Sequence, residues 1–248
     1  MDCVIPDWPA PPGVRALTTT RAGGFSRPPY GSFNLADHVG DAADSVARNR
    51  ALLRERFGVP AEPVWLSQVH GSRVVEAGTP ARADAAYSCR PQVVCAVLTA
   101  DCLPVLFCDR AGTCVAAAHA GWRGLAGGVL EATVEALPAG AADLMAWLGP
   151  AIGPESFEVG DEVREAFIGV DPVAARAFRP TSAERWYADL YLLARQRLSA
   201  AGVGEVFGGG HCTFRDEARF YSYRRDGVTG RMASLIWLQP TVAASGNA

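Results

Sequence analysis

The chain has 248 residues, of which 49% are hydrophobic and 20% are charged, and its formal net charge is −3. This composition supports a sizeable core, and the absence of a basic run argues against duplex nucleic acid as a partner. No stretch of about 18 apolar residues occurs, so the sequence predicts no membrane span. The first residues lack the basic and apolar segments of a secretory signal, so we expect a cytoplasmic protein.

The first half of the chain is expected to hold one helix among several strands. The helix begins near Asp41 or Asp44, either of which can cap it, and runs to about Phe57 before Gly58 ends it. Apolar, β-branched runs predict the strands, which are residues 14–20, 64–69, 73–77, 93–99, 105–108 and 114–118.

The second half alternates helices with strands. Helices are expected at residues 124–137, 161–168 and 186–201, and strands at residues 144–148, 205–207, 219–223 and 234–238. The small, polar tail at 241–248 is expected to be disordered. Since no repeat or linker divides the chain, residues 1–248 are interpreted as one α+β domain with mixed β-sheets flanked by helices and a core at about 14–238.

The types of basic residue and the spacing of the cysteines limit the reactions that this chain can catalyse. All 23 basic residues are arginine, which excludes a lysine Schiff base, a lysine general base and a Walker-type phosphate loop. The seven cysteines form no CxxC pair and are expected to be reduced in the cytoplasm. Cys89, Cys95, Cys108 and Cys114 lie in or near apolar runs, so we expect them to be small core residues.

Three residues with metal-binding side chains stand at the ends of apolar stretches. His70 lies in SQVHG (67–71), Cys102 in TADCLP (99–104) and His119 in HAGWRG (119–124). Two imidazoles and a thiolate are a ligand set for catalytic zinc, which keeps a fourth position open. The alternatives are that Cys102 is a buried thiol or a nucleophile paired with a histidine, and that both histidines are structural.

The segment DRAG (109–112) predicts a hairpin turn between two apolar strands. A four-residue turn would place Cys102 directly opposite His119, with Cβ atoms about 4.5–5.5 Å apart. A three-residue loop with Gly112 in the left-handed conformation would slip the register by one residue. Either way the two residues share one end of the hairpin, whereas this pattern does not position His70.

Neighbouring residues could support this site. Asp101 sits inside an apolar run, where a carboxylate needs a partner, so it is interpreted as a support for a ligand, a general base or an ion-pair partner of arginine. Trp122 and Arg123 offer an aromatic face and an anion-binding fork, or only packing and a surface ion pair.

Eight ordered motifs resemble those of the YfiH family, whose members are also called laccase-domain or polyphenol-oxidase proteins. The resemblance covers roughly residues 14–238. The motifs are TTRAGG (19–24), SFNL (32–35), QVHG (68–71), TADCLP (99–104), HAGWRG (119–124), GPAIG (149–153), CT (212–213) and SYRRD (222–226).

The resemblance implies a Zn²⁺ ion held by His70, Cys102 and His119. It also implies a fold like that of the cytotoxic-necrotizing-factor cysteine hydrolases. The implied reactions are phosphorolysis of adenosine, inosine, guanosine and methylthioadenosine, and deamination of adenosine. Some bacterial members resemble enzymes that edit peptidoglycan precursors. A multicopper laccase is excluded, because its copper centres need more than the four histidines of this chain.

The favoured hypothesis is therefore a cytoplasmic, zinc-dependent purine nucleoside phosphorylase with adenosine deaminase activity. Asp101 is the expected proton carrier beside the three metal ligands. The expected substrate-binding residues are Arg21, Asn34, Arg123 and Arg225, with the backbone at residues 23–24 assisting Arg21 and Arg225 in holding phosphate. Two alternatives stay open: a cysteine or metal hydrolase that edits peptidoglycan precursors, and a non-enzymatic zinc-binding module.

Overall fold

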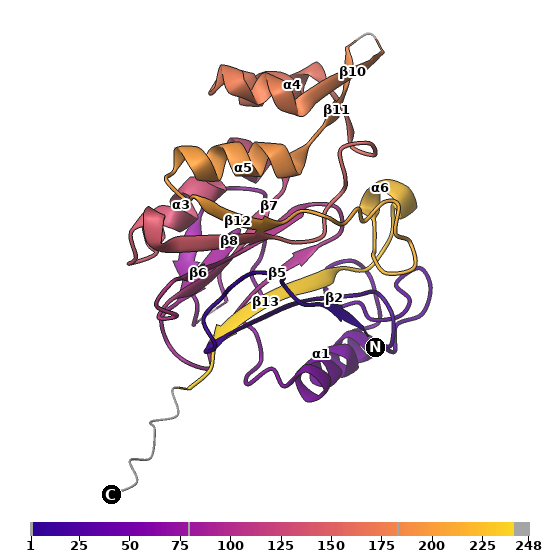
Figure 1. Ribbon diagram of the computed structural model, residues 1–248. Coiled ribbons are helices and arrows are strands. Elements are labelled where there is room, and N and C mark those ends of the chain that lie inside the picture. The colour runs from indigo at the N-terminus through magenta and orange to yellow at the C-terminus, as the bar shows by residue number, and fades with distance from the viewer. Residues whose placement is uncertain (1, 79, 183, 241–248) are drawn as a thin grey trace, which may run out of the picture.

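Two β-sheets stacked face to face form the body of the protein. The computed structural model describes residues 2–78, 80–182 and 184–240, so the tail at 241–248 lies outside the described residues. One helix covers the outer face of the smaller sheet, several helices cover the larger one, and a small lobe stands above them (Figure 1). The predicted α+β class, with mixed sheets flanked by helices, is confirmed.

The smaller sheet joins the two ends of the chain. Its four strands are antiparallel and are, in spatial order, β1 (Cys3–Val4), β2 (Val14–Thr19), β13 (Met232–Leu238) and β5 (Val94–Thr99). Helix α1 (Ala43–Phe57) packs on its outer face through an apolar cluster that includes Leu17, Leu53 and Leu235.

The helix α1 ends as predicted but begins differently. Gly58 ends the helix in the left-handed conformation, with φ of 62°. Glycine is favoured there because it has no Cβ to clash with the backbone. The N-cap position belongs to Ala42, so the prediction that Asp41 or Asp44 caps the helix was wrong. The Asp41 carboxylate instead accepts hydrogen bonds from the side chains of Ser26 and Asn34.

The larger sheet has six strands and mixed directions. In spatial order they are β12 (Glu205–Gly208), β8 (Leu144–Leu148), β6 (Leu103–Asp109), β7 (Val115–Ala120), β4 (Ala85–Ser88) and β3 (Val74–Glu76). The β12–β8 and β3–β4 pairs are parallel and the others are antiparallel. The outer face is covered by helices α2 (Trp122–Ala126), α3 (Val129–Ala136) and α5 (Leu190–Ala200).

The central strands are buried on both faces, which explains their continuous apolar sequences. Every residue of β5, β6 and β7 is buried. Side chains that fill the gap between the sheets include Val97, Leu106, Ala117, Trp147 and Ile236. Because side chains alternate along a strand, every second residue of β5, β6 and β7 faces this gap.

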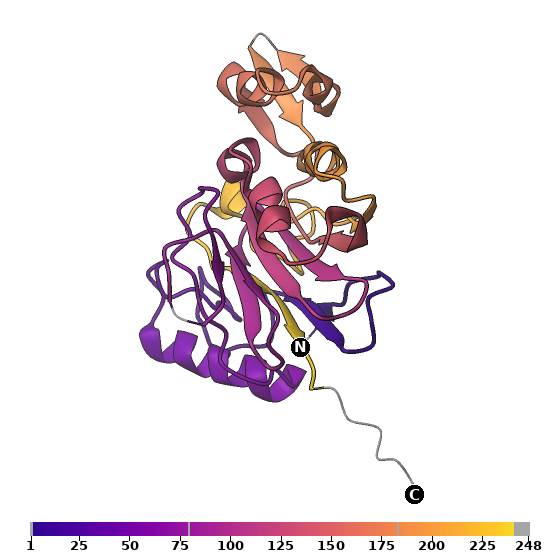
Figure 2. The same ribbon diagram turned by 90° about the vertical axis from the view of Figure 1, so that its left-hand side faces the viewer.

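The lobe is built from residues between β8 and α5. It contains a three-stranded antiparallel sheet with helix α4 (Asp161–Ile168) against it, and it rises beyond α5 in both views (Figures 1 and 2). Its strands and 3₁₀ helix are β9 (Glu158–Gly160), β10 (Phe178–Ser182), β11 (Arg185–Ala188) and η2 (Pro172–Ala177). A second 3₁₀ turn, η1 (Ala141–Asp143), precedes β8.

Several predicted elements were wrong in extent or type. The helix at 124–137 is split into α2 and α3, because Gly128 has φ of 87°. The helix expected from residue 186 begins only at Leu190, after the Asp189 side chain caps it, and the residues before it form β11. The segment at 64–69 is irregular apart from one isolated bridge at Ser67, and the segment at 219–223 is irregular up to Ser222, after which the short helix α6 (Tyr223–Asp226) begins.

The cysteine prediction was half correct. Cys95 and Cys108 are buried thiols, and burial raises the pKa of each to about 12. Cys89 and Cys114, in contrast, are joined in a disulfide, so the prediction of reduced thiols was wrong for this pair. This disulfide could not be predicted from the spacing of the cysteines, because Cys89 and Cys114 lie 25 residues apart in the sequence. Cys89 follows β4 and Cys114 precedes β7, and the pairing of these two strands brings the cysteines together.

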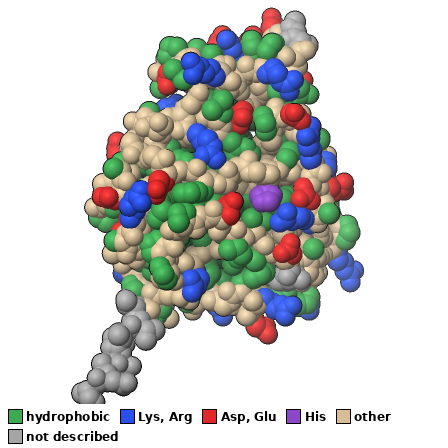
Figure 3. Space-filling view, viewed as in Figure 1, with side chains coloured by type: hydrophobic (Ala, Val, Ile, Leu, Met, Phe, Trp, Pro, Cys, Tyr) green, Lys and Arg blue, Asp and Glu red, His purple; other side chains and the backbone are tan. Residues whose placement is uncertain are grey.

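The described surface agrees with the absence of a basic run in the sequence. Positive and negative side chains are intermingled over the face seen in Figure 3, beside apolar ones. No helix among the described residues has the length and apolar character that crossing a membrane requires.

Candidate metal centre

His70, Cys102 and His119 converge at one end of the gap between the sheets. Their ligand atoms all lie within 4.8 Å of one another, and Cys102 Sγ is 3.9 Å from His70 Nε2. The two imidazole rings are nearly perpendicular, with centroids 4.8 Å apart. Among the described residues, this is the group whose side chains could hold a metal ion.

The β6–β7 hairpin brings Cys102 and His119 together. His119 lies in β7, and Cys102 immediately precedes β6, whose first residue pairs with Ala120. The predicted direct opposition was wrong, because His119 is opposite Pro104. The prediction that both residues share one end of the hairpin is confirmed, and the alternation of β6 and β7 turns both side chains toward the gap.

Asp84 fixes the third ligand, His70, in place. Its fully buried carboxylate accepts hydrogen bonds from the backbone N–H groups of Val69, His70 and Gly71, at 2.8–3.1 Å for the shortest contact of each. His70 has φ of 60°, a left-handed conformation that residues with a Cβ rarely adopt. The three donors surrounding one carboxylate explain why the backbone holds this shape.

Asp84 also orients His119. The Nδ1–H of His119 donates to Asp84 Oδ1 at 2.9 Å, so Nε2 is the nitrogen left for a ligand. Metal-binding histidines commonly donate their other N–H to a carboxylate in this way. Sequence analysis missed Asp84; the available sign was an acid among alanines ahead of a buried strand, where an ionised group needs partners.

The electrostatics favour a thiolate at Cys102. Burial opposes its ionisation, but the charges and hydrogen bonds of His119 and His70 outweigh burial and lower its pKa to about 6. Burial likewise opposes the charged form of His119, yet the Cys102 thiolate and the Asp84 carboxylate raise its pKa to about 9. The Asp84 pKa is lowered despite burial, because His119 and backbone donors stabilise the carboxylate.

Gly121 leaves the space that an ion at this site needs. A Cβ at this position would lie 2.9 Å from Cys102 Sγ, 3.1 Å from His70 Cδ2 and 3.5 Å from His119 Nε2. Because residue 121 is a glycine, the space between these three side chains stays empty. Two imidazole nitrogens and one thiolate suit zinc, and three protein ligands leave a fourth position for water or substrate.

Asp101, the expected proton carrier, lies beside Cys102 with its carboxylate already occupied. Oδ1 accepts a hydrogen bond from the Thr213 hydroxyl, and Oδ2 accepts from the Ser222 hydroxyl and the Arg224 backbone N–H. Its φ is 87°. Asp101 thus ties the loop that carries Cys102 to two segments late in the chain.

Two hollows meet at His70 and Cys102, and the second also reaches His119. The first, of about 240 Å³, has a largely apolar and aromatic wall that includes Trp122, Phe157 and Tyr223, and Arg123 lies on its edge. The second, of about 390 Å³, is more polar and includes Thr99 and Arg231. Both are lined by His70, Cys102 and Tyr223. The candidate centre is therefore reached from two chemically different sides.

Of the four expected substrate-binding residues, only Arg123 lines either hollow. The Arg21 guanidinium stacks over Tyr221 and lines a separate hollow. Asn34 is fully buried, and its side chain bonds to Asp41 and to the backbone of residues 36 and 231. The Arg225 guanidinium donates to three backbone carbonyls and to Asp226, so it braces the loops around it.

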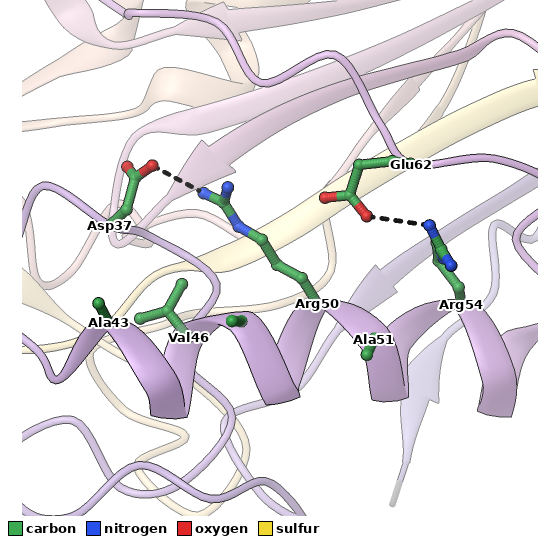
Figure 4. A pocket seen from close by; sticks show the side chains of 8 residues that line it. Asp37, Ala43, Val46, Arg50, Ala51, Arg54 and Glu62 are labelled. Carbon is green, nitrogen blue, oxygen red and sulfur yellow. Dashed lines mark ion pairs between the residues drawn. The ribbon is translucent and has the colours of Figure 1, made fainter.

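A further hollow lies along α1, away from the candidate centre. Figure 4 shows the ion pairs that cross it, from Asp37 to Arg50 and from Glu62 to Arg54. These charges balance one another, and the described lining residues include no histidine or cysteine. This hollow offers no donor set comparable to the His70, Cys102 and His119 group.

The fold and the site together define an α+β protein with a His–Cys–His group that could hold a metal ion at one end of the gap between two stacked sheets. The chain matches the model of the family described as "Multi-copper polyphenol oxidoreductase laccase" over residues 15–239. It therefore belongs to this family.

Curated relatives match over nearly their whole length. Purine nucleoside phosphorylase YfiH of Escherichia coli is 56% identical over 239 residues, covering 95% of this chain and 98% of the relative. Purine nucleoside phosphorylase PA4543 of Pseudomonas aeruginosa is 59% identical with the same coverage.

Solved structures share the fold. The Neisseria meningitidis protein NMB0706 is 52% identical, with a TM-score of 0.93, covering 97% of this chain and all of that one. YlmD from Geobacillus stearothermophilus is 31% identical, with a TM-score of 0.84 and 94% coverage of both chains. The identification with the YfiH proteins is confirmed.

Proposed function

We propose that this chain is a zinc-dependent purine nucleoside phosphorylase of the cytoplasm, acting on adenosine, inosine, guanosine and methylthioadenosine, and that it also deaminates adenosine. The observation that carries the proposal is the three-ligand centre of His70, Cys102 and His119, opening onto two hollows of different polarity. The names of the relatives from Escherichia coli and Pseudomonas aeruginosa support the choice of substrate.

The three side chains would hold the zinc ion, which supplies a Lewis acid and can bring bound water to a pKa near 7. The chain itself provides the orientation. Asp84 keeps Nδ1 of His119 protonated and aims Nε2 toward the centre. The wall formed by Trp122, Phe157 and Tyr223 offers flat apolar faces on which a purine base can stack.

Arg123 and Asp101 take the remaining roles. The Arg123 guanidinium, on the edge of the apolar hollow, would hydrogen-bond acceptor atoms of the base or sugar. We assign Asp101 chiefly a positioning role, since its oxygens already accept three hydrogen bonds from Thr213, Ser222 and Arg224. A proton-carrying role would require one of these bonds to be exchanged during turnover.

The test is a product assay on zinc-loaded protein. Adenosine with inorganic phosphate should give adenine and ribose 1-phosphate, and adenosine without phosphate should give inosine. Cys102→Ser should abolish both, whereas Cys3→Ser, a half-buried free cysteine outside the site, should abolish neither. Lack of turnover by protein shown to contain one metal per chain would refute the proposal.

A second candidate is a cysteine hydrolase that needs no metal and edits peptidoglycan precursors. The observation in its favour is the Cys102 thiolate beside a protonated His119, the pairing that activates cysteine nucleophiles. Cleavage of a muramyl dipeptide precursor carrying a wrong first residue, retained after complete chelation and lost in Cys102→Ser, would favour this candidate over the first.

A non-enzymatic zinc module is the third reading. It requires a closed shell of four protein ligands. The metal-binding group among the described residues offers three, which favours an open site. X-ray absorption of the zinc-loaded protein would decide, because a water or solute oxygen in the first shell is incompatible with a closed site.

A further inference from the structure

We propose that the polar hollow is the binding site for the phosphate co-substrate and that Arg231 and Thr99 are its anchoring residues. This inference rests on the proposed function, and it moves the phosphate site away from Arg21 and Arg225. The hollow measures about 390 Å³ and is continuous with the three candidate metal ligands.

Arg231 is a half-buried cation without a carboxylate partner. Among the described residues, no acidic group lies within ion-pair distance of its guanidinium, whereas Arg225 is paired with Asp226. Nη1 of Arg231 donates to the carbonyls of Thr229 and Gly230, which fixes the plane of the group. Nε and Nη2 carry no hydrogen bond within the described part of the chain, so three N–H donors remain for a ligand, and the Tyr223 ring lies 5.8 Å from the guanidinium carbon.

Thr99 supplies a second and independent observation. The residue is only 1% exposed, and its Oγ1 atom has no hydrogen-bond partner among the described residues. A buried hydroxyl without a partner is costly, so it indicates a missing acceptor or donor. Strand alternation turns Thr99 to the same side as Cys95 and Val97, toward the gap that ends at the candidate centre.

The two residues are held together by the sheet. Thr99 pairs with Met232 in the β5–β13 ladder, so Arg231 is one residue from the direct partner of Thr99. Both residues line the hollow, together with His38 at its outer edge. A guanidinium and a hydroxyl that line the same hollow offer N–H and O–H donors that suit a phosphate group.

The charges around the hollow favour an anion. No described aspartate or glutamate lines it, and the one anionic group on its wall is the Cys102 thiolate, which is a candidate ligand of the metal. Two carboxylates lie close by: Asp37 is 3.4 Å from His38 Nδ1, and Asp101, after Cys102, acts electrostatically on Arg231. Asp101 has three hydrogen-bond donors of its own, which reduces its repulsion of an anion. A metal ion at the centre would add positive charge to the same space.

The geometry fits the bond changes of phosphorolysis. A phosphate oxygen forms a bond to C1′ of the ribose while the C1′–N bond to the purine breaks, and the bonding electron pair goes to the base, which takes up a proton. The products are ribose 1-phosphate and the free base. Because the two hollows meet at His70, Cys102 and Tyr223, phosphate from the polar side and base on the apolar side would face each other across the ribose.

The test compares Thr99→Val and Arg231→Met with the unaltered zinc-loaded protein. We expect KM for phosphate to rise about tenfold in Thr99→Val and about 100-fold in Arg231→Met, with KM for inosine changed less than threefold. Thr133→Val is the matched control, because its hydroxyl is buried, bonds within helix α3 to the Val129 carbonyl and does not line the hollow. Arg21→Met tests the competing location.

A direct binding measurement separates this inference from the proposed function. Titration of zinc-loaded protein with inorganic phosphate, followed by calorimetry, should show binding that both variants weaken, even if no nucleoside is turned over. Normal phosphate affinity and normal KM in both variants would overturn the inference while leaving phosphorolysis intact. A phosphate defect in Arg21→Met but not in Arg231→Met would overturn it equally.

Discussion

Gly121→Ala tests whether the volume beside the three ligands is the metal site. Gly121 has φ of −60° and ψ of 156°, an extended conformation that alanine adopts freely, so the substitution adds no backbone strain. The new methyl carbon would lie 2.9 Å from Cys102 Sγ and 3.5 Å from His119 Nε2. A sulfur and a carbon are normally separated by at least about 3.5 Å, so one ligand has to move.

The expected effect is large on metal affinity and small on folding. Displacing one ligand should weaken zinc binding by about 100-fold or more, since even changes outside the ligand set commonly cost 10–100-fold. Overpacking should lower the free energy of unfolding of the metal-free protein by about 1–3 kcal/mol. Competition with a chromogenic chelator measures the affinity, and thermal unfolding measures the stability.

Gly204→Ala is the matched control. A Cβ at Gly204 would meet no atom within 4 Å, and its φ is not positive, so zinc affinity should be unchanged. If Gly121→Ala bound zinc within threefold of the parent, with the fold intact, the reasoning that places the ion among these three side chains would be refuted.

Three further outcomes are expected. In the metal-free protein, the pKa is about 6 for Cys102 and about 9 for His119. Between pH 6 and pH 9 this pair therefore holds one proton, which zinc has to displace when it binds. Zinc affinity should therefore rise about tenfold per pH unit from pH 6 to 9 and level off above, and a pH-independent affinity would contradict the pairing. Asp84→Asn, which places an amide donor against N–H groups, should weaken zinc binding about 10–100-fold, as chelator competition would show. Reducing the Cys89–Cys114 disulfide should cost about 3 kcal/mol and lower Tm by roughly 6–12 °C in thermal unfolding of metal-free protein; an unchanged Tm would argue against the disulfide.

The β6–β7 hairpin shows what the periodicity of the sequence can and cannot predict. The apolar runs correctly predicted β6 and β7, because both faces of these strands are buried. The register depended on where the turn begins, and this is decided by a side chain. The Asp109 carboxylate accepts hydrogen bonds from the backbone of Thr113 and Cys114, so the strands pair up to residues 109 and 114 and the loop starts one residue later than predicted.

The ligands could be predicted, but the group that organises them could not. Histidine and cysteine are scarce and stood out at the ends of apolar runs. Asp84 has no local signature, because its partners come from the loop at residues 69–71 and from β7, which only the folded chain brings together. The same holds for Thr99, whose hydroxyl has no hydrogen-bond partner among the described residues, and for Arg231, which lines the same hollow.

The lobe has a consequence for how this protein can diversify. Its first strand follows Phe157 directly and its last strand leads into Leu190, and both residues line the apolar hollow. The three candidate metal ligands, by contrast, lie outside the lobe: His119 is in β7, Cys102 immediately precedes β6, and His70 is in the loop at residues 69–71. Insertions or exchanges between these two residues would therefore reshape one wall of the hollow while the ligand register stays constant. Under the proposed function, one part of the base-binding wall and the candidate metal ligands would therefore lie in separate stretches of the chain, which makes the lobe the natural segment to transplant between relatives.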